Sequence, residues 1–156
     1  MVRPRGQSLE QEIDALLAGL HDDQGRGRNA PSADEPDRIQ FLRDVTRELF
    51  IPVFDELKRR YAGSGVELEM DASNFLAGGR EIQLLFGMAQ HRSKLTGTVI
   101  PEGIAFHETR YTPDLQGELL SGPMLRARTI NAEVFRNFLC ARLAILLRAV
   151  TRYRQR

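Results

Sequence analysis

The sequence predicts an α+β fold in which two long helices flank a run of consecutive strands. Near both ends of the expected domain, apolar residues recur every three or four positions, which is the spacing of one helix face. Between these stretches the spacing changes to every second residue, which is typical of strands with one buried face. We therefore expect an antiparallel meander of four or five strands, with both long helices packed on one face of the sheet.

The chain of 156 residues is long enough for one domain and a tethered segment. Residues 1–20 form that segment, and Ser8 and Gln11 have the spacing of a capping box before a short amphipathic helix. Residues 21–37 are rich in glycine, proline and acidic residues, so we expect a flexible acidic linker before a single domain at 38–156. So short a helix is marginal alone, and we expect it to dock on its own domain or on another chain. Its apolar stripe consists of Leu9, Ile13, Leu16, Leu17 and Leu20.

The first long helix of the domain carries an apolar stripe with helical spacing from Leu42 to Leu57. Pro52 interrupts this stripe, removes one backbone donor and clashes with the carbonyl of Glu48. We therefore expect a kink or two abutting helices instead of one straight helix.

Alternating apolar residues predict strands at 66–70, 82–88, 95–100 and 104–109. The last two flank Pro101, Glu102 and Gly103, which indicates a hairpin with a short loop. A short final strand is expected at 124–129, because Pro123 limits strand formation in the residues before it.

The last helix is expected at 131–153, with Asn131 or Thr129 as its N-cap. Its main apolar stripe consists of Phe135, Leu139, Leu143, Leu146, Val150 and Tyr153. A second apolar side, interrupted by Arg142, consists of Val134, Phe138, Ile145 and Ala149. Two apolar sides indicate two neighbours, so the second side packs on another helix of this chain or binds another protein or a second copy of the chain.

Charge is distributed unevenly along the chain. Residues 9–37 hold eight acidic residues and two arginines, whereas residues 124–156 hold eight arginines and one acidic residue. The basic end is a candidate polyanion-binding surface, although aromatic residues that would stack on bases are not interleaved with the arginines. The candidate residues are Arg126, Arg128, Arg142, Arg148, Arg152, Arg154 and Arg156.

Three polar residues, His107, Glu108 and Arg110, are the nearest approach to a catalytic constellation. Neighbouring strand residues point to opposite faces of a sheet, so we interpret these residues as an exposed polar strand edge. A nonstandard active site around them is the open alternative. The chain has no zinc-ligand spacing and no phosphate-loop or nucleophile motif. The sequence therefore favours a non-catalytic protein without a metal or cofactor.

No apolar run approaches the length of a membrane span, and the first residues lack the apolar core of a signal peptide. We expect a cytoplasmic protein that does not contact membranes. Its expected function is that of a small protein-interaction or adaptor module, as a subunit of a larger assembly or a homodimer. The alternative is a nucleic-acid-binding module that uses the arginine-rich last helix.

Overall fold

The computed structural model describes residues 13, 35–114 and 117–155. The chain divides into two units, residues 1–38 and residues 39–156, and the account below concerns the second unit and the helix that enters it. Except for Ile13, the expected docking helix lies outside the described residues. Most of the expected linker and Arg156 also lie outside them.

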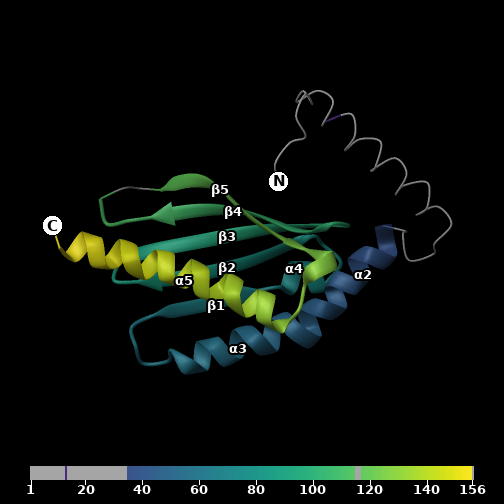
Figure 1. Ribbon diagram of the computed structural model, residues 1–156, viewed down its shortest axis with the longest axis horizontal. Coiled ribbons are helices and arrows are strands. Elements are labelled where there is room, and N and C mark those ends of the chain that lie inside the picture. The colour runs from purple at the N-terminus through teal and green to yellow at the C-terminus, as the bar shows by residue number, and fades with distance from the viewer. Residues whose placement is uncertain (1–12, 14–34, 115–116, 156) are drawn as a thin grey trace, which may run out of the picture. The chain divides into compact units, whose positions relative to one another are not determined.

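Five antiparallel strands form one sheet in the order of the chain, which confirms the meander (Figure 1). They are β1 Glu67–Asp71, β2 Glu81–Met88, β3 His91–Ile100, β4 Gly103–Tyr111 and β5 Glu118–Arg126. The helices before the strands are α2 Glu35–Val45, η2 Thr46–Phe50 and α3 Ile51–Arg60, and α4 Ser73–Leu76 connects β1 to β2. The long helix after the strands is α5 Ala132–Arg154.

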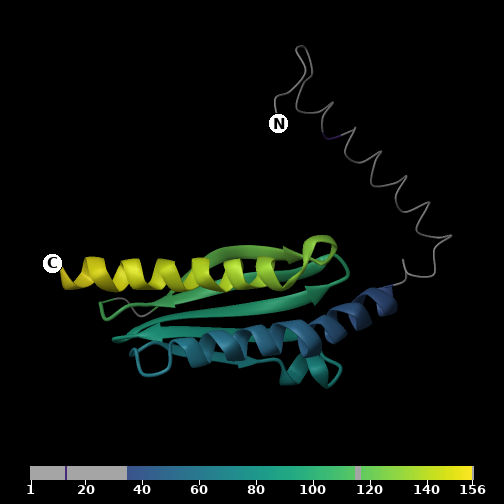
Figure 2. The same cartoon turned by 60° about the horizontal axis from the view of Figure 1, so that its bottom comes forward.

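Both long helices lie on the same face of the sheet, as expected for this α+β arrangement (Figure 2). Helix α3 lies over β1, α5 lies over β2 and β3, and the two helices contact each other. The core between these layers contains a stack of Phe50 on Phe135, with ring centroids 4.2 Å apart. The predicted stripe of α5 is confirmed, because its first five members are buried and only Tyr153 is half-exposed. Asn131 is the N-cap, and its side chain accepts a hydrogen bond from the amide of Val134 at 2.8 Å.

Pro52 lies in continuous helical structure, because the chain passes from α2 to α3 through the π-helix η2. The amide of Ile51 donates to the carbonyl of Thr46, which is a step of five residues. A wider turn of this kind accommodates a residue that lacks an amide hydrogen and crowds the preceding turn. The interruption expected at Pro52 is therefore a change of hydrogen-bonding pattern between α2 and α3, and the chain stays helical throughout.

The prediction for the last strand was wrong. Strand β5 begins at Glu118 and includes Pro123, and residues 127–129 form a 3₁₀ turn, η3. Proline is tolerated here for two reasons: β5 is an edge strand, and its register with β4 shifts opposite Phe106. Gly122 lies at this bulge, where a Cβ atom would approach the carbonyl oxygen of Phe106 to 2.4 Å. None of the described helices is both long and apolar enough to cross a bilayer.

Candidate protein-interaction surface and a buried polar cluster

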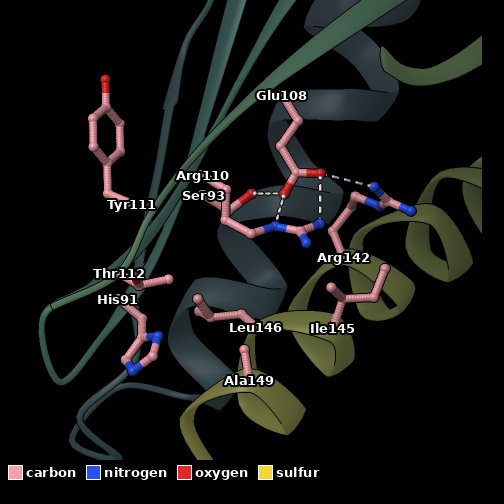
Figure 3. A pocket seen from close by; sticks show the side chains of 10 residues that line it. All are labelled: His91, Ser93, Glu108, Arg110, Tyr111, Thr112, Arg142, Ile145, Leu146 and Ala149. Atoms are coloured by element: carbon pink, nitrogen blue, oxygen red, sulfur yellow. Dashed lines mark hydrogen bonds and ion pairs between the residues drawn. The ribbon is translucent and has the colours of Figure 1, made fainter. Parts of the chain in front are cut away.

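A buried carboxylate, Glu108, lies between the sheet and α5 and is 3% exposed. The Ser93 hydroxyl donates a hydrogen bond to its Oε2 atom at 2.8 Å. Arg110 donates from Nε to Oε2 at 3.0 Å and from Nη2 to Oε1 at 3.1 Å. The Arg142 Nη1 atom lies 3.4 Å from Oε1, so two guanidinium groups contact one carboxylate (Figure 3).

Strand periodicity places these residues together. Ser93 pairs with Arg110 and Leu95 pairs with Glu108, so these side chains share the face of the sheet that bears the helices. Arg142 reaches the same point from α5. The expectation that Glu108 and Arg110 form an exposed strand edge was therefore wrong, because α5 covers this part of the strand. His107 lies on the opposite face and is exposed, so the structure does not bring it to the other two residues.

The charge state of Glu108 follows from competing effects. Burial raises the pKa of this carboxyl group, since a charged group loses solvation in the interior. The hydrogen bonds from Arg110 and Ser93 and the charges of Arg110 and Arg142 outweigh burial and hold the pKa of Glu108 below its ordinary value of 4.5. The cluster is therefore an ion pair that fixes α5 to β4.

His91 lies beside this cluster, at the start of β3, and is 3% exposed. Neither of its ring nitrogens has a hydrogen-bond partner in the structure. The edge of its ring contacts Tyr153, with centroids 5.3 Å apart. The adjoining cavity of about 10 Å³ has room for about one water molecule. Two buried nitrogens without partners lower the stability of the folded chain.

Replacing His91 with leucine should raise the free energy of unfolding by about 1 kcal/mol, because the substitution removes two unsatisfied polar atoms from an apolar site. Urea denaturation of the two proteins measures the difference. Replacing Ser93 with alanine is the matched control on the same strand, and it should lower stability because the Glu108 carboxylate loses a donor. A loss of stability in the His91 variant would show that the imidazole has a partner in solution.

A surface cleft of about 400 Å³ adjoins His91 at the C-terminal end of α5. Its charges balance, since two arginines, Arg110 and Arg152, and two acidic residues, Asp114 and Glu118, line it. Among the described residues, no group of three or more histidine, cysteine or acidic side chains is placed to hold a metal ion. Ser93 donates to a carboxylate that two arginines already neutralise, so its hydroxyl is not activated as a nucleophile. The contacts of the cluster therefore hold α5 on the sheet and do not activate a reactive group.

The second apolar side of α5 is half-buried at every position. Val134 and Phe138 pack against the edge of the core, and the Phe138 ring lies 5.2 Å from that of Phe106. Ile145 and Ala149 line the small cavity beside Glu108 (Figure 3). On the neighbouring strand β5, Leu120 pairs with Glu108, so it shares this face and is also half-buried. We call this surface the α5 flank, and it consists of Leu120, Val134, Phe138, Ile145 and Ala149.

The candidate polyanion-binding arginines do not form one patch. Arg142 points into the domain toward Glu108, and elsewhere on α5 the Arg136 guanidinium pairs with Glu56 at 2.9 Å. Two exposed arginines precede the start of α5, and three occupy its last turns, so a helix length of about 30 Å separates the groups. The first group is Arg126 and Arg128, and the second is Arg148, Arg152 and Arg154.

Comparisons with protein-family models, curated proteins and solved structures found no match. The function is therefore inferred from the surface and its chemistry.

Sequence reasoning missed two members of the polar cluster, His91 and Ser93. His91 and Ser93 point to the same face of β3 as the buried Leu95, and Glu108 points to the same face of β4 as the buried Phe106. Polar residues at these inward positions were the sequence feature that could have predicted the cluster.

Proposed function

We propose that this chain is a non-catalytic protein-interaction module that binds an acidic amphipathic helix of a partner protein along the α5 flank. The proposal rests on one observation. Among the described residues, the helical layer ends at α5, and β5 continues the sheet beyond it with the partly buried Leu120 on the same face (Figure 1). This part of the helix-bearing face lies beside half-buried apolar side chains.

The dimensions of the two layers support a helix as the bound element. Neighbouring strands are about 4.8 Å apart and packed helices about 10 Å apart, so one helix covers about two strands. Helices α3 and α5 lie over β1, β2 and β3, and the helix-facing side chains of β4 are also buried, so the space beside α5 lies over the outer strand β5. A helix placed there would complete the burial of Leu120, Phe138 and Ile145.

The local charge supports an acidic partner. From residue 118 to residue 155 the chain contains seven arginines and two acidic residues, and five arginines remain when Arg136 and Arg142, which pair with Glu56 and Glu108, are set aside. Charge complementarity favours an acidic helix, whereas a second copy of this basic surface would meet like charge. The separation of the arginines along α5 provides no continuous path for a nucleic-acid backbone.

The test uses the full chain and a labelled amphipathic peptide of about 18 residues, with leucines on one side and glutamates on the other. Replacing Leu120 with lysine should weaken binding of this peptide by about tenfold, because a charge enters the α5 flank. Leu119 is the matched control, since it neighbours Leu120 but lies on the opposite face and is 75% exposed. The Leu119→Lys variant should bind the peptide as the unmodified chain does, and fluorescence anisotropy measures both affinities.

Equal weakening by the two lysine variants would overturn the assignment of this surface. Light scattering tests whether a second copy of the chain occupies this surface. A dimer that dissociates only in the Leu120→Lys variant would make the partner a second copy of the chain. Retention on DNA or RNA that disappears when Arg148, Arg152 and Arg154 are changed to glutamate would replace the proposal with a nucleic-acid-binding function.

A further inference from the structure

The other edge of the sheet, strand β1, has a hollow on each of its two sides. Within the described residues β1 pairs only with β2, so its second edge has no strand beside it. Residues 69–71 border a hollow of about 340 Å³ on the side of α3 and one of about 350 Å³ on the opposite face. The two hollows therefore meet along one short stretch of unpaired backbone.

The two hollows differ in chemistry. The hollow beside α3 is lined by apolar side chains that include Ile51, Phe54 and Leu76, and by polar side chains that include Asp55 and Lys58. The hollow on the opposite face is bordered by two carboxylates, Glu69 and Asp71, and by one ammonium group, that of Lys94. The register of β1 explains this difference, because Met70 pairs with the buried Leu84 and points toward the helices, whereas Glu69 and Asp71 point away from them.

We infer that the free edge of β1 binds an extended segment of a partner protein in which apolar and basic side chains alternate. A strand added to an edge forms backbone hydrogen bonds with it, and its side chains point alternately to the two faces. One set of side chains would enter the apolar hollow beside α3, and the other set would meet the acidic hollow. The inference concerns a surface separate from the α5 flank and does not depend on the function proposed for that flank.

The acidic residues of β1 suit a basic segment. The Ser73 hydroxyl and amide donate hydrogen bonds to Asp71, which lowers the pKa of this carboxyl group and keeps it ionised at neutral pH. Glu67 pairs with Arg92 at 3.0 Å. Glu69 pairs with Lys58 at 3.1 Å, and both of these side chains are about half-exposed.

Lys58 has a particular position in this arrangement. It belongs to α3, on one side of β1, whereas the strand directs Glu69 toward the other side, so their ion pair spans the free edge. Exposed ion pairs contribute little to stability, so a lysine of the incoming segment can replace Lys58 at Glu69. Lys58 therefore limits access to this edge.

The test uses the full chain and a labelled peptide of about seven residues in which valine and lysine alternate. Two further peptides carry N-methyl groups on either the valine amides or the lysine amides. Alternate amides of an added strand face β1 and the others face solvent, so one methylated peptide should bind as the parent does. The other should bind about tenfold more weakly, as measured by fluorescence anisotropy.

Variants of the chain locate the binding edge. Glu69→Lys should weaken binding of the parent peptide by about tenfold, and Lys58→Gln should strengthen it. Glu102→Lys is the control, because it makes the same change of net charge at an exposed turn between β3 and β4. Leu120→Lys should leave binding unchanged, which separates this site from the α5 flank.

Equal binding of the two methylated peptides would overturn the inference, because unspecific charge attraction does not depend on which amides are blocked. Equal weakening by Glu102→Lys and Glu69→Lys would overturn it as well. Amide exchange provides a second readout, since backbone amides of residues 67–71 should exchange more slowly when the parent peptide is bound.

Discussion

Replacing Glu108 with methionine should lower the free energy of unfolding by about 3 kcal/mol. The substitution leaves the guanidinium groups of Arg110 and Arg142 next to each other without the carboxylate that neutralises both. The side chain of Arg142 is only 21% exposed, so water compensates little of this loss. Urea denaturation at neutral pH measures the change.

A double-mutant cycle with Arg142→Met is the control for this prediction. The double variant should be more stable than the sum of the two single losses indicates, because only Arg110, whose side chain is 33% exposed, then remains without the carboxylate and no second guanidinium lies against it. Additive losses would mean that Arg142 and Glu108 do not interact in solution, despite the distance of 3.4 Å between them.

The pH dependence of stability provides a second check on Glu108. Because the pKa of this carboxyl group is lowered in the folded chain, its ionised form stabilises the fold at pH values above the ordinary 4.5. That contribution is lost as the pH falls through the lower pKa of the folded state. The difference in stability between the unmodified chain and Glu108→Gln should therefore shrink as the pH falls below 4.5. A difference that stays constant over this range would contradict the ion pair.

The largest loss of stability is expected for Phe135→Ala, at about 4 kcal/mol. Phe135 is 2% exposed and its ring is stacked on Phe50, so truncation leaves a cavity between α5 and η2. The same truncation at Phe138, three residues along the helix, should cost about half as much, because that ring is already half-exposed on the α5 flank. Thermal or urea denaturation compares the two variants. Equal losses would show that both sides of α5 belong to one core.

Much of the fold could be predicted because it depends on local periodicity. The steps of three and four from Phe135 to Val150 are a property of the chain alone, and they correctly identify the buried face of α5. The alternation in β2 likewise predicts its buried residues Ile82, Leu84 and Phe86. Asn131 was one of the two predicted caps of this helix, and the structure selects it over Thr129.

Other local features could not be read in this way. The turn between β2 and β3 places Ala89 and Gln90 at positive φ values of 49° and 71°. Hairpins of this kind usually carry glycine, asparagine or aspartate at such positions, so the sequence contains no turn signal there. At β5, proline suggested a break, and only the bulge opposite Phe106 allows the strand to continue.

The amino-acid sequence by itself determined the order of the long helices and the strands and the buried side of α5 and β2, because both follow from the spacing of apolar residues within one element. Only the tertiary structure decided the partners of the polar residues. Glu108 and Arg142 are 34 residues apart, and they meet because α5 crosses the sheet at that point. The same crossing leaves β5 beside the α5 flank, since the position of a helix over a sheet depends on packing between elements that the periodicity of neither element specifies.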